Sequence, residues 1–356
     1  MPTSDPARPI DLPPLAQRPL VSVLIANYNY ARFVPAALDS LLGQSYPHWE
    51  AVVLDDGSTD GSPAIIRGYV ERDARIRLVE QPNGGQNAAV NACYRRLTGD
   101  IVCLLDSDDT FAPSKLRQVV DTLRANPAVG VVTHFCDVID PDGRVRDVTL
   151  NSRLDRGWLG TTAFDRGGCV YVPPTSCMSF RREVIDLLMP LPPEQVRDAD
   201  GYLGMAAQFL TPFAVIDAKL SGYRVHGNNM GGLTEPTPKR LHYELMLIGD
   251  RTANLKAFVA ARFGPEIAMR LHIEDNPQYL QAALKLAAVG DRADRQRVGD
   301  ARLLARRHPS LTWRAMWRAV LSLPGPLRRR VLPMIHRSHR LKAAIRRWFP
   351  RPAGAA

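Results

Sequence analysis

The chain has 356 residues, with 45% hydrophobic and 23% charged side chains, enough for one large α/β domain plus a smaller appendage. No run reaches the roughly 20 apolar residues that a membrane-spanning helix needs, and the proline-rich start lacks the apolar stretch of a signal peptide. The five cysteines form neither a CxxC pair nor a zinc spacing, so we expect free thiols in a reducing, cytoplasmic compartment.

The net charge of +10 is unevenly distributed along the chain. Residues 301–356 contain fourteen Lys or Arg and no Asp or Glu, which leaves 32 basic and 36 acidic residues, a net −4, in the first 300. The basic character therefore belongs to a C-terminal tail. Because no recognition motif accompanies this charge, we expect no nucleic-acid partner.

Short apolar runs alternate with segments of helical spacing from Leu20 onward, after a proline-rich leader at 1–18 that we expect to be disordered. We expect strands at Val21–Ala26, Ala51–Leu54, Ile76–Val79, Ile101–Leu105 and Val129–Thr133. We expect helices at Ala31–Gly43, Ser62–Arg72, Asn87–Leu97 and Pro113–Ala125. This alternation predicts an α/β fold, Rossmann-like, with a mostly parallel sheet flanked by helices. Ligands of such sheets bind beyond the carboxyl ends of the strands.

The regular alternation ends after Asp137. We expect additional strands within Cys169–Phe180 and at Tyr223–Val225, and a helix at Asp200–Phe209. Residues 236–300 have helical spacing, and the basic tail carries helical segments interrupted by prolines.

An acidic segment, Asp55-Asp56-Gly57-Ser58-Thr59-Asp60, follows the second predicted strand. Its carboxylates can accept hydrogen bonds from a base N–H and from ribose hydroxyls. The alternative is a loop whose Ser or Thr caps the next helix.

A second acidic segment, Asp106-Ser107-Asp108-Asp109, follows the fourth strand. Three crowded carboxylates repel one another unless a cation neutralises them, and oxygen ligands of this kind suit Mg²⁺ or Mn²⁺. Capping and solvated charge remain the alternative here.

Three further segments carry candidate chemistry. Asn83-Gly84-Gly85-Gln86-Asn87 precedes a helix and can bring backbone N–H groups to a diphosphate, although a simple loop explains it equally well. Asp198-Ala199-Asp200 can supply a general base or a helix cap. In the segment from Tyr223 to Asn229, His226 can bind a metal and Arg224 can neutralise a diphosphate, or both can be structural.

Taken in order, these segments resemble glycosyltransferase family 2, whose members have the GT-A fold. The resemblance covers Leu20 to Asn229 and begins with Asn27-Tyr28-Asn29 at the end of the first strand. It implies an inverting, non-processive transferase that moves a sugar from a nucleotide diphosphate donor, with UDP as the expected nucleotide. It also implies the domain organisation: catalytic domain 19–235, nucleotide-sugar half about 19–135, acceptor half about 136–235, helical extension 236–300 and basic amphipathic tail 301–356.

The resemblance also implies roles for individual residues. The nucleotide-binding residues would be Asn27, Tyr28, Asn29, Asp55, Asp56, Gly84, Gly85 and Asp106. The Mg²⁺ or Mn²⁺ ion would be held by Asp106, Asp108 and His226, with Asp109 in support and Arg224 at the diphosphate. Asp200 would be the catalytic base, with Asp198 as the alternative. The family's base usually lies in a Glu-Asp pair, whereas here Arg197 precedes Asp198 and Ala199 precedes Asp200.

Two departures from the family pattern concern the donor site and processivity. Val90 stands where many relatives carry an Arg before Asn91, so any donor contact of that Arg is missing or supplied elsewhere. The QxxRW motif of the processive, membrane-embedded members is incomplete, since Ala344 stands in place of the Gln before Arg347-Trp348. We therefore expect transfer of a single sugar to a lipid-linked or saccharide acceptor in cell-surface polysaccharide or glycolipid assembly.

The tail has the pattern of an interfacial helix, with apolar residues at helical spacing among Arg and Lys. Trp313 and Trp317 lie four residues apart beside Arg314 and Arg318. This pattern favours contact with an anionic membrane at the inner face of the cell; the alternative is a helix packed on the protein with a solvated basic face. Two other functions stay open: a catalytically inactive sugar-nucleotide-binding or scaffold module, and a nucleotidyltransferase. The latter would need a glycine-rich basic loop where Asn27-Tyr28-Asn29 stands.

Overall fold

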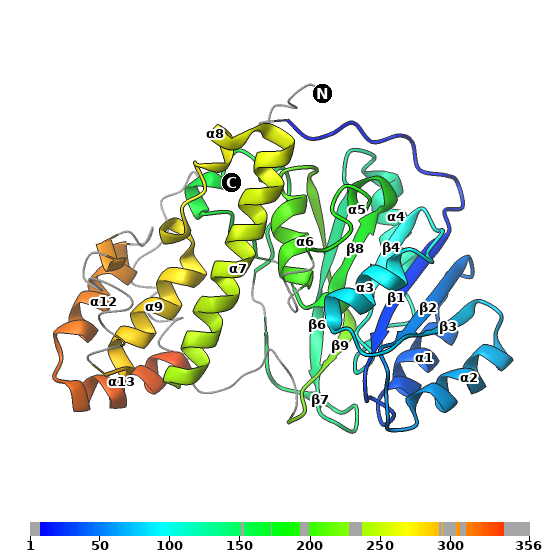
Figure 1. Cartoon of the computed structure of the whole chain (residues 1–356), viewed down its shortest axis with the longest axis horizontal. Coiled ribbons are helices and arrows are strands. Elements are labelled where there is room, and N and C mark those ends of the chain that lie inside the picture. The colour runs from blue at the N-terminus through cyan, green and yellow to red at the C-terminus, as the bar shows by residue number, and fades with distance from the viewer. Residues whose placement is uncertain are drawn as a thin grey trace. The chain divides into compact units, whose positions relative to one another are not determined.

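The computed structural model describes residues 8–150, 153–171, 173–192, 199–227, 237–291, 294, 304–306 and 311–337 (Figure 1). The chain divides into two compact units, which are described separately. Unit 1 comprises Met1–Ala163, Val170–Gly232 and Asn254–Ala268, and unit 2 comprises Phe164–Cys169, Leu233–Ala253 and Met269–Ala356. All the candidate site residues named from the sequence lie in unit 1.

A nine-stranded sheet forms the centre of unit 1. Along its main path the strands run in the order β3 (Ile76–Glu80), β2 (Trp49–Asp55), β1 (Val21–Asn27), β4 (Ile101–Leu104), β8 (Met178–Arg181), β6 (Val131–Ile139), β9 (Phe213–Arg224) and β5 (Thr110–Phe111). The ninth strand, β7 (Val145–Arg146), pairs with β6.

The strands from β3 to β4 are all parallel, and this confirms the α/β fold that the alternation predicts. The remainder of the sheet is mixed: β8 lies antiparallel to both β4 and β6, whereas β6 and β9 are parallel. The two-residue strand β5 pairs antiparallel with β9. Because β8 is antiparallel to both neighbours, it is not joined to them by the strand–helix–strand connection of a parallel sheet. Hydrophobic periodicity alone therefore predicts the parallel half of the sheet better than the mixed half.

The helices of unit 1 cover both faces of this sheet, as Figure 1 shows for α3 in front of β1 and β2. The helices are α1 (Val34–Leu42), α2 (Ser62–Arg72), α3 (Gln86–Tyr94), α4 (Lys115–Ala125), α5 (Arg182–Ile185), α6 (Ala199–Ala207) and α8 (Pro265–Ala268). Both α1 and α2 carry proline in the first turn, where its missing N–H costs no helical hydrogen bond. For this reason α1 begins at Val34, beside Pro35, three residues later than the helical spacing predicts.

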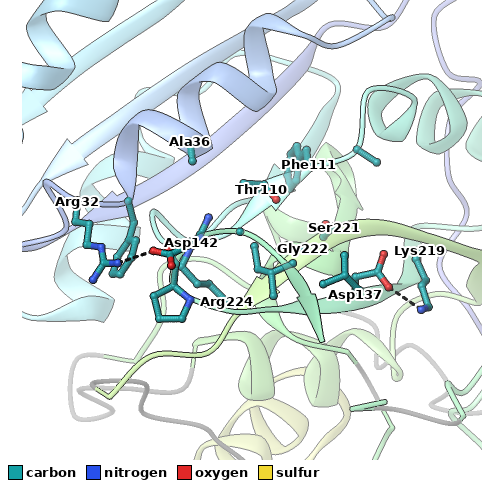
Figure 2. A pocket seen from close by; sticks show the side chains of 16 residues that line it. Arg32, Ala36, Thr110, Phe111, Asp137, Asp142, Lys219, Ser221, Gly222 and Arg224 are labelled. Atoms are coloured by element: carbon teal, nitrogen blue, oxygen red, sulfur yellow. Dashed lines mark hydrogen bonds and ion pairs between the residues drawn. The ribbon is translucent and has the colours of Figure 1, made fainter. Parts of the chain in front are cut away.

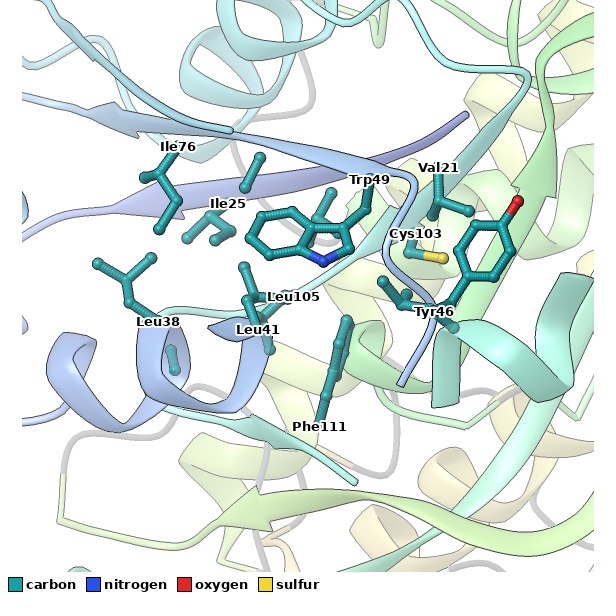
Figure 3. Close-up of a cluster of buried hydrophobic side chains, with 14 of the residues drawn as sticks. Val21, Ile25, Leu38, Leu41, Tyr46, Trp49, Ile76, Cys103, Leu105 and Phe111 are labelled. Carbon is teal, nitrogen blue, oxygen red and sulfur yellow. The ribbon is translucent and has the colours of Figure 1, made fainter. Parts of the chain in front are cut away.

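The main apolar core lies between the sheet and the face covered by α1, α2 and α4 (Figure 3). Ile25 of β1 and Leu38 of α1 have no solvent exposure, and Trp49 of β2 has 2%. Each such side chain contributes about 1.5–3 kcal/mol through removal of apolar surface from water. The rigid core fixes the ends of β1, β2 and β4, from which the acidic segments project.

Residues 8–18, part of the segment predicted as a disordered leader, form neither helix nor strand, yet they contact the domain. The Ile10 N–H donates to the Leu210 carbonyl at 2.7 Å, and Arg181 Nη2 donates to the Pro13 carbonyl at 2.5 Å. Arg181 is fully buried and also pairs with Glu183 at 2.9 Å, so this segment adds a further acceptor to a buried cation. Proline-rich composition alone does not reveal such a contact.

Unit 2 is helical and contains α9 (Pro277–Val289), α12 (Leu311–Ser322), α13 (Gly325–Arg337) and the part of α7 (Pro238–Phe263) that precedes Asn254. Trp317 is 1% exposed and clusters with Leu284 and Ala288 of α9. The prediction that Trp317 faces a membrane is therefore wrong, because its indole fills the core of this unit. Among the described residues, no helix is long and apolar enough to cross a bilayer. Residues 338–356, with the rest of the predicted interfacial helix, lie outside the described residues.

Candidate active site

The first acidic loop, Asp55–Asp60, is tied to the end of the neighbouring strand β1. The Asp55 carboxylate accepts hydrogen bonds from Asn27 Nδ2 at 2.7 Å, from the Ser58 backbone N–H at 2.8 Å and from Ser58 Oγ at 2.7 Å. Asn29 has a left-handed backbone with a φ of 58°, and its Oδ1 accepts from the Thr59 N–H at 2.8 Å. The predicted residues Asn27, Asn29 and Asp55 therefore lie together at one sheet edge.

Tyr28 lies between these two asparagines and is 48% exposed, so its ring is available for contact with a planar ligand. Asn27 is buried, and its Oδ1 has no hydrogen-bond partner among the described residues. A buried polar atom without a partner costs free energy, and a bound ligand can supply the missing donor.

Asp56 anchors the third motif segment instead of facing outward. Its carboxylate accepts from Gln81 Nε2 at 2.7 Å and from the backbone N–H groups of Gly84 and Gly85, each at 2.9 Å. Next to it, Gly57 has a φ of 76°, and a Cβ there would lie 2.8 Å from the Asn83 nitrogen. The Asp55–Asp60 loop and the segment from Asn83 to Gly85 therefore form one compact structure. Their close approach explains why glycine stands at position 57.

The second acidic loop gathers three carboxylates in a small volume after β4. One carboxylate oxygen from each of Asp106, Asp108 and Asp109 lies within 4.8 Å of the others. Burial, together with the charges of Asp108 and Asp200, raises the pKa of Asp106 to about 8, and a hydrogen bond from Thr175 opposes this only in part. Burial and the charges of Asp108 and Asp106 raise the pKa of Asp109 well above its usual range. A divalent cation would relieve this repulsion.

The three carboxylates differ in their partners. Both oxygens of Asp109 are engaged, Oδ1 by the Arg224 backbone N–H at 2.8 Å and Oδ2 by Ser176 Oγ at 2.6 Å. Asp108 Oδ2 lies 2.9 Å from His226 Nε2. Asp109 is therefore held at both oxygens, and the predicted metal ligation by Asp106, Asp108 and His226 stays a prediction. Oxygen and imidazole donors of this kind fit Mn²⁺ or Mg²⁺.

His226 is held by an aromatic contact as well as by Asp108. Its ring stacks on Phe33 with centroids 4.9 Å apart and meets the edge of the Tyr30 ring at 5.6 Å. Burial and the charges of the acidic loop, Asp108 first among them, raise the pKa of Tyr30 above its usual range, so this hydroxyl stays neutral. Neither Phe33 nor Tyr30 has a motif signal in the sequence, and only their place at the start of α1 brings them here.

Arg224 lies at the end of β9 and is 3% exposed. Its Nε donates to the Asp108 carbonyl at 2.6 Å, and its Nη1 donates to the carbonyls of Asp140 and Pro141 at 3.0 Å. These contacts use the guanidinium to join the acidic loop to the β6–β7 turn. The predicted diphosphate contact of Arg224 stays a prediction beside this positioning role.

Asp200 lies in the first turn of α6, where it receives the backbone N–H of Gly201 at 2.9 Å. Its charge is among the causes that raise the pKa of both Asp106 and Tyr223, so it lies near the three-carboxylate cluster. The predicted role of Asp200 as the catalytic base stays a prediction. Asp198, the alternative base, lies outside the described residues.

Two more buried polar atoms without described partners occur in the motif segments, Ser107 Oγ in the second acidic loop and Asn87 Oδ1 at the start of α3. Together with Asn27 Oδ1 they come from the elements that carry the nucleotide motifs. These orphaned atoms and the clustered carboxylates are independent observations, and both fit a polar ligand that binds with a cation.

A cavity of about 500 Å³ lies on another side of Arg224 and Phe33, and Figure 2 shows the side chains that line it. Two ion pairs occur in its wall, Arg32–Asp142 at 2.9 Å and Lys219–Asp137 at 2.6 Å. None of the three clustered aspartates lines this cavity. The cavity therefore borders the second acidic loop through Phe33 and Arg224 without including its carboxylates.

Comparisons with known proteins agree with this geometry. Residues 22–188 match the model of glycosyl transferase family 2. An uncharacterized glycosyltransferase of Nostoc sp. is 36% identical over 213 residues, which cover 59% of this chain and 66% of that protein. The putative teichuronic acid biosynthesis glycosyltransferase TuaG of Bacillus subtilis is 39% identical over 105 residues, 29% of this chain and 42% of that protein. The chain thus spans less than two thirds of the length of these relatives.

Among solved structures, S. aureus TarS residues 1–349 in complex with UDP-GlcNAc aligns with a TM-score of 0.51 at 17% identity, over 85% of this chain and 90% of that chain. This likeness concerns the fold and places the chain among GT-A proteins. The chain belongs to glycosyltransferase family 2 through a domain that covers residues 22–188.

Proposed function

We propose that this protein is an inverting glycosyltransferase that moves one sugar from a nucleotide-diphosphate donor to an acceptor hydroxyl. The observation that carries the proposal is the cluster of Asp106, Asp108 and Asp109, with Asp200 near it, at the carboxyl end of β4. A divalent cation would neutralise such a cluster and, when bound, would supply charge stabilisation for a leaving diphosphate.

The donor would lie over the two loops at the ends of β1 and β2. The exposed Tyr28 ring and the unpartnered Asn27 Oδ1 support a base or ribose contact there. The loop of Gly84 and Gly85, held by Asp56, would present α3 to the diphosphate. A UDP-sugar is the donor class we propose first, since TarS, which shares the fold, binds UDP-GlcNAc.

Asp106, Asp108 and His226 would hold Mg²⁺ or Mn²⁺, which when bound supplies charge stabilisation at the diphosphate. Asp200 would accept the proton of the acceptor hydroxyl as its oxygen attacks the anomeric carbon. The bond from that carbon to the diphosphate breaks in the same step, which inverts the configuration. Arg224, with its guanidinium on the carbonyls of Asp108, Asp140 and Pro141, would keep the acidic loop in place.

A thermal-shift screen tests the donor site. UDP, dTDP and GDP are each added with and without Mn²⁺ or Mg²⁺. A ligand at about 100 times its Kd adds about 2.7 kcal/mol to stability, which raises Tm by several degrees. A shift for one nucleotide that depends on the metal supports the proposal and identifies the donor class. No shift with any nucleotide would favour the inactive scaffold module instead.

The acceptor we propose is lipid-linked or a saccharide, and we place the protein in the cytoplasm at the inner face of the membrane. The name of TuaG links that relative to the biosynthesis of a cell-surface polymer. Arg318, Arg329 and Arg330 are exposed on α12 and α13 and continue the basic character of the tail. Sedimentation with anionic vesicles tests this, by comparing the full chain with one that ends at Arg337. Because α12 contributes Trp317 to the core of unit 2, a deletion that starts earlier would unfold that unit. Equal binding of both chains would remove residues 338–356 from the proposal.

A further inference from the structure

Ser176 joins the acidic loop to the rest of the domain, although it lies 67 residues from Asp109 in the sequence. It belongs to η2, a single turn of 3-10 helix at Thr175–Cys177, directly before β8. Its hydroxyl donates to Asp109 Oδ2 at 2.6 Å and accepts the Asp106 backbone N–H at 3.0 Å. One side chain therefore contacts two members of the three-carboxylate cluster.

The backbone of Ser176 is fixed from the other side. Its carbonyl accepts from Lys115 Nζ at 2.6 Å and from Ser221 Oγ at 2.6 Å. Lys115 has no solvent exposure, and its ammonium lies 3.3 Å from the centroid of the Phe111 ring. A buried ammonium is costly unless it is partnered, so Lys115 and the Ser176 carbonyl hold each other strongly. Ser176 is itself 1% exposed and cannot exchange its partners for solvent.

We propose that Ser176 is a positioning residue that presets the divalent-cation site, and that the buried Lys115 holds it in place. By engaging Asp109 Oδ2 and the Asp106 N–H, Ser176 fixes one carboxylate as a support and directs the loop so that Asp106 and Asp108 present ligand oxygens. Without this hydroxyl, Asp109 keeps only the Arg224 N–H at Oδ1, its Oδ2 can turn toward the neighbouring carboxylates, and the cation must reorder the loop when it binds. This inference rests on the proposed function, because it concerns the same cation site.

The test measures Mn²⁺ affinity by calorimetry on the full chain, with and without UDP, for Ser176→Ala and for Ser221→Ala as a matched control. Both variants remove one buried serine hydroxyl near the same carbonyl, but Ser221 contacts no carboxylate of the cluster. Mutation of a residue that supports a metal site typically lowers metal affinity by about 10–100-fold. We therefore expect Ser176→Ala to weaken Mn²⁺ binding by about tenfold or more. Ser221→Ala should lower Tm and leave Mn²⁺ affinity unchanged. Ser176→Thr, which keeps the hydroxyl, should restore the affinity.

Several outcomes overturn the inference. Wild-type affinity in Ser176→Ala does so, and so does an equal loss in both Ala variants, which would indicate a merely structural role. If Ser176→Ala does not fold, Ser176→Cys replaces it, because a thiol is a weak donor of similar size; unchanged affinity in that variant has the same meaning. Failure of the wild-type chain to bind Mn²⁺ with any nucleotide is a separate result, and it would reject the proposed function itself.

Discussion

The two acidic loops of the domain have similar sequences at similar places, yet they handle their charge in opposite ways. In the loop after β2, Asp55 and Asp56 each accept three hydrogen bonds from the chain itself. In the loop after β4, Asp106, Asp108 and Asp109 lie against one another, and the pKa of Asp106 rises to about 8 through burial and the charges of Asp108 and Asp200.

Hydrogen bonds to a carboxylate stabilise its charged form, whereas like charges destabilise it. The first loop is therefore complete without a ligand and serves as a rigid floor. In the second loop the carboxylates repel one another, and a bound cation would relieve this repulsion. Substitutions should separate the two loops cleanly, since one supports stability and the other supports chemistry.

The largest effect is expected for Asp200→Asn, which removes the proposed base. General-base catalysis contributes about 10²–10⁴-fold, so kcat should fall within that range while binding of UDP and Mn²⁺ is retained. The measurement is transfer from a UDP-sugar with Asp198→Asn assayed beside it. A large loss in Asp198→Asn together with normal turnover in Asp200→Asn would move the base to Asp198.

Asp108→Asn should weaken Mn²⁺ binding by at least about 100-fold. Loss of a residue that only supports a metal ligand lowers affinity by about 10–100-fold, and loss of a ligand should lower it more. Tm of the metal-free protein should not fall, since the change also removes a like charge from beside Asp106 and Asp109. Calorimetry with Mn²⁺ and a melting curve in EDTA check both parts. A drop in metal-free Tm with intact Mn²⁺ binding would contradict the comparison.

Asp56→Asn should show the opposite pattern. Because the Gly84 N–H bonds Oδ1 and the Gly85 N–H bonds Oδ2, the amide would turn its NH2 group toward one of these two donors, and an unsatisfied buried pair costs about 1–3 kcal/mol. Each kcal/mol lowers Tm by about 2–4 °C in a domain of this size. Mn²⁺ affinity without nucleotide should stay at the wild-type value, because Asp56 lies in the other loop. Loss of Mn²⁺ binding in this variant would show that the two loops act as one.

The smallest expected effect is a pH dependence of the metal-free protein. The pKa of Asp106 is raised to about 8, above its value in the unfolded chain, so its contribution to stability is lost as pH rises toward 8. The free energy of unfolding should therefore fall by at most about 1.4 kcal/mol per pH unit for one proton between pH 6.5 and 8. Tm in EDTA should fall with it. Below about pH 6.5 a second group opposes this dependence: burial lowers the pKa of His134, so the unfolded chain binds a proton there that the folded chain does not.

Added Mn²⁺ should raise Tm more at pH 8 than at pH 6.5, since metal ligands must lose their protons. The Asp108→Asn variant provides the control, because it removes a charge that helps to raise the pKa of Asp106. An equal Mn²⁺ effect at both pH values would place the cation elsewhere.

The sequence alone predicts the parallel half of the fold and both acidic loops, because these depend on local periodicity and on residues that follow strands directly. It does not predict β5, whose two residues leave no periodic signal, or the packing of Trp317 into unit 2. The positions of Ser176 and Phe33 were also missed. Ser176 reaches Asp109 across 67 residues, and nothing in its neighbourhood marks it as different from other buried serines.

The contact between the Arg224 N–H and Asp109 joins residues 115 positions apart. Contacts of such long range close large loops and form late when a chain folds. The cation site would therefore be assembled among the last features of the domain, after the parallel strands have paired. Newly made chains would therefore bind the metal, and use a sugar donor, only after β9 has joined the sheet.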